Sequence, residues 1–282
     1  MDFKFDFLAP LTNDADDTPV TPTTGTLLED EVEELVFCPT PTPSGANNEH
    51  LPTFTQTILG DETVIKHITA SGQQVDSVGD NTDLVPGVYE GGWKTWECSY
   101  LLLDYLYEKY PKWRKGDNVL ELGCGSGLPG LYCLLRGASV TFQDYNKDVL
   151  QELTMPNARL TCSENVDQLT NCKFFSGDWK HFHAIMVANK CRYDIILTSE
   201  TIYNCNSYQK LHNIFKDCLS DHGTILVSCK SHYFGVGGGV ESFKDFVARQ
   251  GVFNTKTVLT TNKNLQCSIL QLSRRMTEHL ES

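Results

Sequence analysis

The sequence predicts an α/β fold: a doubly wound, mostly parallel seven-stranded sheet with an antiparallel closing strand. Two observations lead to this prediction. From about residue 84 onward, apolar strand-like runs alternate with amphipathic helix-like segments, a pattern typical of parallel sheets covered by helices on both faces. In addition, glycine, acidic and aromatic residues follow the ends of several predicted strands, which is where such sheets bind ligands.

The expected elements follow in a regular order. A helix over 95–110 ends before Pro111, and a buried strand covers 118–124. The next elements are a helix at 130–137, a strand at 139–145, a helix at 147–155 broken by Pro156, strands at 172–179 and 193–203, a helix at 207–220, a strand at 223–231 and a helix at 239–250. Two closing strands, within 254–261 and 265–274, are close enough in sequence to form an antiparallel pair.

We divide the chain into an acidic, Thr/Pro-rich and mostly disordered arm (1–50), a variable lead-in (51–83) and a folded domain (84–282). The arm holds 11 acidic residues and one lysine, so most of the net charge of −13 lies there. Such a composition cannot bury enough apolar surface to order itself, and we expect the arm to be dispensable for folding. Within it, 27–37 is a candidate transient helix or docking segment, and Phe3, Phe5 and Phe7 alternate as in a strand.

The composition also limits the class of partner and compartment. We expect neither a signal peptide nor a membrane span, because the first ten residues are acidic and no apolar run reaches the length that a span requires. Its eleven cysteines show no metal-binding spacing, which indicates reduced thiols and no metal site. No basic stripe suggests direct binding of nucleic acid. We expect a monomer in the cytoplasm, with the nucleus as a second compartment, and a basic protein partner for the arm; the alternative is an arm that binds nothing.

The first predicted strand ends in the glycine turn "LELGCGSGLPG". Gly125, Gly127 and Gly130 match the spacing of a dinucleotide site, so an NAD-dependent dehydrogenase has to be considered. Counted from Gly123, which directly follows the strand, the third glycine is missing. Glu121 at the strand end would repel a pyrophosphate, but it would suit a ligand that carries an ammonium and a sulfonium. S-adenosylmethionine has both groups and no phosphate, and we prefer it; a bare turn without a ligand is the alternative.

Acidic residues also end the next strands. Asp144 lies 21 residues beyond Gly123 and can accept hydrogen bonds from both ribose hydroxyls. Asp178 and Trp179 suit an adenine, although Asp178 could instead be a helix N-cap. Ser199 and Glu200 end the fourth strand, next to the expected position of the methyl group.

Six motifs in order carry a resemblance: "GVYEGGWKTWECSYLLLDYL", "LELGCGSGLPG", "FQDYN", "FFSGDW", "LTSETIYN" and "KSHYFGVGGGV". Together they resemble the protein-histidine methyltransferases, a group of class I, seven-stranded, S-adenosylmethionine-dependent enzymes with a Rossmann-like fold, over roughly residues 84–275. The resemblance implies S-adenosylmethionine as cofactor and S-adenosylhomocysteine as product. It also implies a pocket formed by Thr95, Trp96, Glu97, Cys98, Ser99, Gly123, Gln143, Asp144, Tyr145, Gly177, Asp178, Trp179 and Ser199, to which our reading of the glycine turn adds Glu121 and Gly125.

The substrate that the resemblance implies is one histidine of large-subunit ribosomal protein L-three, methylated at the distal (tele) ring nitrogen. A related group of lysine methyltransferases shares the Trp-Glu and Glu-Leu-Gly-Cys-Gly signatures and is the second interpretation. A third is a non-catalytic scaffold with an acidic binding arm, which the intact glycines and Asp144 argue against. Imidazole needs an acceptor that fixes its tautomer more than it needs a strong base, and Glu200 and Tyr203 are our candidates. For Glu200, a structural cap or a ligand of the cofactor's ammonium is the alternative.

The run Gly235–Gly239 follows the fifth predicted strand. We expect it to form a substrate rim that includes Gly238, with His232, Tyr233 and Phe234 as its wall. The alternatives are a tightly packed turn before the helix for the glycines and a structural hydrogen-bonding role for His232.

Overall fold

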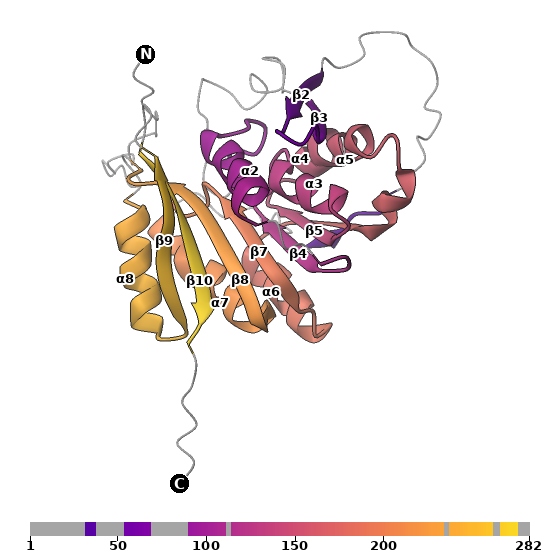
Figure 1. Cartoon of the computed structure of the whole chain (residues 1–282). Coiled ribbons are helices and arrows are strands. Elements are labelled where there is room, and N and C mark those ends of the chain that lie inside the picture. Colours follow the sequence, from indigo (N-terminus) through magenta and orange to yellow (C-terminus); the bar gives the residue numbers. More distant parts are fainter. Residues whose placement is uncertain are drawn as a thin grey trace, which may run out of the picture.

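The computed structural model describes residues 32–37, 54–68, 90–110, 114–233, 237–261 and 266–275. Phe3, Phe5, Phe7 and Phe234, together with most of the arm, lie outside these ranges. The main sheet has eight strands in the order β1-β6-β5-β4-β7-β8-β10-β9 (Figure 1). Their bounds are β1 Glu33–Glu34, β4 Asn118–Leu122, β5 Ser139–Asp144, β6 Cys172–Ser176, β7 Tyr193–Ser199, β8 Leu219–Lys230, β9 Phe253–Thr261 and β10 Cys267–Arg274.

The sheet is parallel at its centre and antiparallel at both edges. Strands β6, β5, β4, β7 and β8 pair in parallel, whereas β10 pairs antiparallel with both β8 and β9. The order reverses beside β4, which has β5 on one side and β7 on the other. The predicted fold class and the predicted closing pair are therefore confirmed, and β1 is the additional eighth strand.

Helices cover both faces of this sheet (Figure 1). One face packs against α2 Glu97–Lys109, α3 Leu128–Leu135 and α5 Met155–Thr161. The other face packs against α6 Trp179–Ala188, α7 Tyr208–Cys218 and α8 Val240–Gln250. Strand β4 shows why: Val119 belongs to the first apolar cluster, whereas Leu120 and Leu122 belong to the second, because successive side chains of a strand point to opposite faces. None of the described helices is both long and apolar enough to cross a bilayer.

The helix expected over 147–155 differs from the prediction at Pro156. Helix α4 Lys147–Val149 continues through a π-helical segment, Leu150–Thr154, into α5. Pro156 lies in the first turn after the π-helical segment, where the regular α-helical hydrogen bond that a proline removes is already interrupted. The prediction that Pro156 breaks the helix was wrong, since the wide π-helical turn allows the chain to continue.

The arm contributes to the fold through residues 32–37. Glu33 and Glu34 pair antiparallel with β6, Leu35 is buried, and the Phe37 ring lies 4.9 Å from that of Phe174. This segment is a strand that docks on the sheet edge and not a helix. Residues 32–37 thus act as the docking segment that the sequence offered as one alternative: Leu35 and Phe37 pack on the core, whereas Glu33, Glu34 and Val36 are exposed.

The lead-in also contains a described element. Strands β2 Phe54–Ile58 and β3 Val64–Ile68 form a separate antiparallel hairpin. Its inner side is anchored by a hydrogen bond from the Ile68 N–H to Asn157 Oδ1 in α5, 2.7 Å long. The remaining domain boundaries stay predictions.

Candidate functional site

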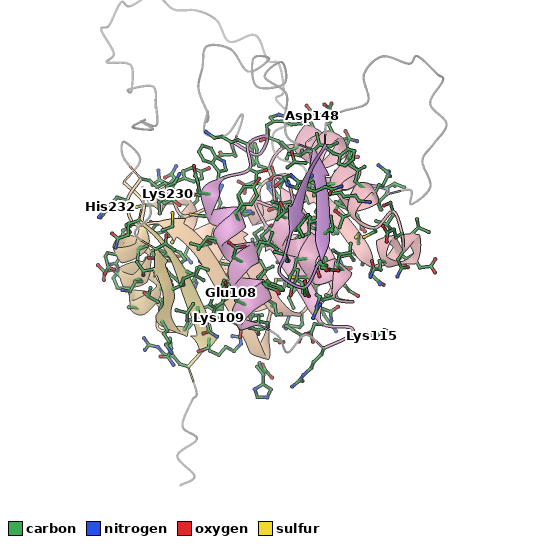
Figure 2. The ribbon with its side chains drawn as sticks, turned by 45° about the horizontal axis from the view of Figure 1, so that its top comes forward. Glu108, Lys109, Lys115, Asp148, Lys230 and His232 are labelled. Carbon is green, nitrogen blue, oxygen red and sulfur yellow. The ribbon has the colours of Figure 1, made fainter. Side chains whose placement is uncertain are left out.

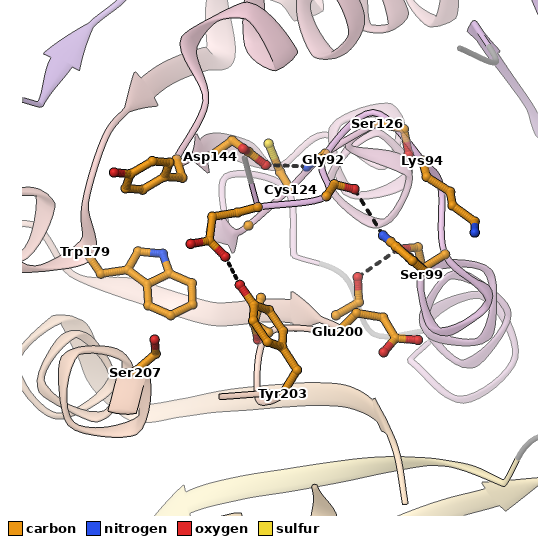
Figure 3. Close-up of a pocket in the computed structure, with 18 of the residues that line it drawn as sticks. Gly92, Lys94, Ser99, Cys124, Ser126, Asp144, Trp179, Glu200, Tyr203 and Ser207 are labelled. Atoms are coloured by element: carbon orange, nitrogen blue, oxygen red, sulfur yellow. Dashed lines mark hydrogen bonds between the residues drawn. The ribbon is translucent and has the colours of Figure 1, made fainter. Parts of the chain in front are cut away.

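A cavity of about 300 Å³ lies at the carboxyl ends of the central strands, within the size range of small-molecule sites. Segments far apart in the sequence meet around it (Figure 3). Thirteen of the predicted site residues line it: Thr95, Trp96, Ser99, Gly123, Gly125, Asp144, Tyr145, Gly177, Asp178, Trp179, Ser199, Glu200 and Tyr203.

The glycine turn after β4 forms the floor of this cavity. Gly123 and Gly125 adopt φ values of +59° and +49°, a region that favours glycine. A Cβ on Gly123 would come within 2.8 Å of the Thr201 methyl group, and one on Gly125 within 3.0 Å of the Gly92 carbonyl oxygen. The absence of side chains therefore keeps the floor open.

Asp144 ends β5 beside this turn. Its Oδ2 accepts a hydrogen bond from the Gly125 N–H at 2.9 Å, and its Oδ1 accepts one from the Asn146 N–H at 3.1 Å. Burial raises the pKa of Asp144 to about 6, so the side chain is a carboxylate at neutral pH. Each carboxylate oxygen can accept a second hydrogen bond, so Asp144 can hold the turn and accept ligand hydroxyls.

Glu121 is not placed as the sequence suggested. It lies on the face of β4 that packs against α3, where its Oε2 accepts a hydrogen bond from the Gly130 N–H at 2.8 Å. Burial raises its pKa to about 8, so it is mostly neutral at pH 7. Among the described residues it does not line the cavity. Glu121 therefore holds the start of α3, and the role of a direct ligand for an ammonium is not supported.

The end of β6 combines a cap with an aromatic wall. Asp178 accepts a hydrogen bond from the Lys180 N–H at 2.7 Å and from Lys210 Nζ at 2.6 Å, which makes it the N-cap of α6. The Trp179 indole N–H donates to Gln143 Oε1 at 2.8 Å, while Gln143 Nε2 donates to the Gly177 carbonyl at 2.7 Å. Gln143 thus orients the Trp179 indole through this hydrogen bond, although Gln143 itself does not line the described cavity.

Glu200 lies in a buried ionic network after β7. Tyr233 Oη donates to Glu200 Oε2 at 2.5 Å, and Lys230 Nζ lies 3.4 Å from Glu200 Oε1 and 3.6 Å from Glu97 Oε2. Glu200 has a φ of +58°, a left-handed conformation rare for a residue with a side chain. Burial and the Glu200 carboxylate raise the pKa of Tyr233 well above its ordinary value, so its hydroxyl remains a donor.

The opposite wall is the loop before α2. Tyr203 Oη donates a hydrogen bond to Glu90 Oε2, which joins this loop to the one after β7 (Figure 3). The Trp96 indole N–H donates to the Gly91 carbonyl at 3.1 Å, and Ser99 Oγ lies 2.8 Å from Ser199 Oγ. Tyr203 thus contacts the Glu90 carboxylate, which was not expected from the sequence.

Five further expected pocket or rim positions lie elsewhere: Glu97, Cys98, His232, Tyr233 and Gly238. Gly238 packs beneath the Tyr203 loop, to whose carbonyl its N–H donates at 2.9 Å. His232 is exposed at the end of β8 beyond Lys230 (Figure 2), and its backbone bridges to Gly239. Cys98 is buried in α2. None of the five lines the described cavity.

Ten further residues line the cavity that were not expected from the sequence: Glu90, Gly91, Gly92, Lys94, Cys124, Ser126, Thr201, Asn204, Ser207 and Lys210. Most of them lie inside the motifs already quoted. These residues are identified by their spatial proximity to the glycine turn, which a single sequence does not reveal.

Comparisons with known proteins agree with this geometry. Residues 87–246 match the family described as lysine methyltransferase. The chain is 46% identical over 179 residues to a histidine protein methyltransferase 1 homolog of Dictyostelium discoideum, covering 64% of this chain and 56% of that one. It is 41% identical over 219 residues to the Mus musculus homolog, covering 70% of this chain and 60% of that one. It thus spans little more than half of these relatives.

A solved structure shares the fold. A putative S-adenosylmethionine-dependent methyltransferase from Streptococcus mutans superimposes with a TM-score of 0.54 at 12% identity, covering 80% of this chain and 57% of that one. This likeness confirms the fold class, and the match to a methyltransferase family confirms the predicted cofactor, S-adenosylmethionine. The resemblance to the protein-histidine methyltransferases is confirmed as well, and this chain belongs to the methyltransferase family described as lysine methyltransferase.

Proposed function

We propose that this chain transfers the methyl group of S-adenosylmethionine to the tele nitrogen of a histidine side chain, on large-subunit ribosomal protein L-three. The names of two relatives, 46% and 41% identical to this chain, support histidine as the target. The choice of ring nitrogen and of ribosomal protein rests on the family resemblance. The monomeric state and the cytoplasmic location stay predictions.

The cavity fits a cationic cofactor without phosphates. Asp144 and Glu200 bring carboxylates to it, and the glycine turn leaves room for a ligand close to the backbone. Its two lysines are already engaged: Lys210 with Asp178 at 2.6 Å, and Lys94 over the Trp96 ring at 4.3 Å. When bound, S-adenosylmethionine supplies an electrophilic methyl group on a sulfonium. Gly123, Gly125, Asp144 and Trp179 are the residues that would hold it.

The observation that carries the proposal is the Tyr203 hydroxyl on the cavity wall. A histidine is about 90% neutral near pH 7.4, given an ordinary pKa of about 6.5, so the enzyme has to orient it more than deprotonate it. Orientation requires an acceptor for the ring N–H, and a phenolic oxygen can accept. Tyr203 and Glu200 both line the cavity beyond the glycine turn, which supports the two candidates proposed from the sequence.

The second candidate function is lysine methylation, which the description of the matching family favours. Mass spectrometry separates the two. The full chain is incubated with methyl-labelled S-adenosylmethionine and large-subunit ribosomal proteins, and the labelled residues are then identified. We expect tele-methylhistidine on the L-three protein, and no label when its target histidine is replaced by alanine.

Label on lysine alone would establish the second function and overturn the first. Calorimetric titration with S-adenosylmethionine tests the third interpretation, because a scaffold with a defective site would give no binding heat. We expect binding, and NAD should give none.

A further inference from the structure

Glu90 and Tyr203 form a pair across the cavity although they are 113 residues apart. Glu90 precedes the loop that leads into α2, and Tyr203 follows β7. Both side chains are partly buried and both line the cavity. Their hydrogen bond is charge-assisted, since the acceptor is a carboxylate. The phenolic proton therefore points to Glu90. The lone pairs of the Tyr203 oxygen are then available to accept a hydrogen bond from a ligand.

The backbone on the Glu90 side is fixed. The Glu90 N–H donates to Asn146 Oδ1 at 3.1 Å. Two residues on, Gly92 lies so close to α4 that an added Cβ would come within 3.0 Å of both methyl groups of Val149. The loop therefore packs against α4 and the residue before it, and these contacts fix the position from which the Glu90 side chain contacts Tyr203.

The backbone on the Tyr203 side is fixed by the glycine run. The Gly238 N–H donates to the Tyr203 carbonyl at 2.9 Å, and Asn204 forms a bridge with Gly237. The Tyr203 ring also packs edge-on against Tyr233, with centroids 6.3 Å apart. Gly237 and Gly238 therefore fix the position of the Tyr203 segment, and neither of them lines the described cavity.

Glu200, by contrast, is already engaged by other residues of the chain. One of its oxygens accepts from Tyr233 Oη at 2.5 Å, and the other faces the Lys230 ammonium at 3.4 Å. Because Glu200 already interacts with the Tyr233 hydroxyl and the Lys230 ammonium, it is a weaker candidate than Tyr203 to accept a hydrogen bond from a substrate N–H.

We propose that Tyr203, polarised by Glu90, accepts the Nδ1–H of the target imidazole and so presents the Nε2 lone pair for methylation. Tyr203 is the catalytic residue in this scheme, and Glu90 is a positioning residue that acts through it. The inference deepens the proposed histidine methylation and rests on it. It explains why the distal nitrogen would be selected, because a ring whose Nδ1 carries the proton has its lone pair on Nε2.

The charges balance in this scheme. The Nε2 lone pair forms the new N–C bond, the electron pair of the breaking S–C bond stays on sulfur, and the positive charge moves to the ring. The methylated ring then holds its proton on Nδ1, hydrogen-bonded to Tyr203 and close to the Glu90 anion. Loss of that proton to solvent returns a neutral methylhistidine and leaves Tyr203 and Glu90 as they began.

The test compares Glu90→Gln and Tyr203→Phe with Glu108→Gln as the matched control. Glu108 is exposed near the far end of α2, away from Lys230 and His232 (Figure 2). Three quantities are measured on full-length protein: the affinity for S-adenosylmethionine by calorimetry, kcat on the L-three protein, and the ratio of tele- to pros-methylhistidine. A fourth, without cofactor, is the affinity for a peptide of the L-three protein around the target histidine, compared with the same peptide carrying alanine.

We expect both site variants to lose about 10- to 100-fold in kcat, as is typical of a misplaced reactant, while cofactor affinity changes less than threefold. Pros-methylhistidine should become detectable, and the preference for the histidine peptide over the alanine peptide should disappear. The control should match wild type. Suppose that wild type makes tele-methylhistidine and that both variants keep the wild-type kcat, nitrogen selectivity and peptide preference. That result would overturn the inference but not the proposed function. A wild type that makes no methylhistidine would overturn the proposed function itself.

Discussion

Gly238→Ala tests what the glycine run does. A Cβ on Gly238 would lie 2.2 Å from the Ile202 carbonyl oxygen and 2.3 Å from the carbonyl carbon of Tyr203. An ordinary carbon–oxygen contact is about 3.4 Å, so one backbone has to move by roughly 1 Å. Both partners are backbone atoms, and no side chain can rotate away. One side of this contact is the segment that carries Tyr203.

The expected magnitudes follow from that clash. Overpacking of this kind costs about 1–3 kcal/mol, which lowers the melting temperature of a domain this size by about 2–12 °C. A misplacement of about 1 Å at a reacting group can lower turnover roughly 100-fold. S-adenosylmethionine affinity should change little, because Gly238 does not line the described cavity.

Gly237→Ala is the comparison variant. Gly237 has a φ of +77°, but an added Cβ there meets no atom within 4 Å. It should therefore cost only the strain of a left-handed residue, about 1–2 kcal/mol, with turnover per folded molecule close to wild type. The assays are thermal unfolding, calorimetric titration and turnover at a temperature where all three proteins are folded. If Gly238→Ala kept wild-type turnover, or if Gly237→Ala lost as much, the glycine run would not position Tyr203.

Three further predictions concern residues whose environment the structure defines. Asp144→Ala should weaken S-adenosylmethionine binding about 10- to 100-fold by removing charge-assisted hydrogen bonds. In wild type, calorimetry should show affinity falling below about pH 6, as the Asp144 carboxylate becomes protonated. Glu121→Gln should leave cofactor affinity unchanged. The folded-state pKa of Glu121 is raised from 4.5 to about 8, so wild type should lose stability as the pH rises through that range, and the variant should lose less. A chain beginning at Glu49 lacks the buried Leu35 and should melt about 5 °C or more below one beginning at residue 31; equal melting temperatures would show that the docked segment adds no stability.

The sequence could predict the order of the elements because periodicity is a local property. The strands over 118–124 and 139–145 and the helix over 239–250 all appear within a few residues of their expected bounds. Pro156 was misjudged because the π-helical turn before it has no known sequence signature. The strand at Glu33 was missed because two acidic residues carry no strand pattern; its stability comes from Leu35 and Phe37 packing on the sheet.

Site residues at strand ends could be predicted, but not how far each lies from the cavity. Glu121 and Asp144 both lie near the ends of neighbouring strands, yet Glu121 contacts α3 and Asp144 lines the cavity. The two side chains are on the same face of the sheet, because Glu121 pairs with Phe142 and Asp144 follows Phe142 by two residues. Asp144 therefore lies further toward the carboxyl end of the sheet, and a single sequence does not give the strand register that decides this. Glu90 shows the second limit: its partner is 113 residues away, and nothing in its local sequence marks the contact.

The Glu90 carboxylate also bears on the choice between histidine and lysine. A nearby anion stabilises a cation, so it raises the pKa of any basic target. If the shift is about one unit, an imidazole moves from about 6.5 to 7.5 and nearly half of it is still neutral at pH 7.4. A lysine moves from about 10.4 to 11.4, and only about one molecule in ten thousand keeps the lone pair that methylation needs. The pH dependence of turnover should therefore level off above about pH 8 with a histidine target, whereas a lysine target would show a rate that rises about tenfold per pH unit up to pH 10. A continued tenfold rise on the L-three protein would mean that the anion faces an ammonium, and the histidine assignment would fail.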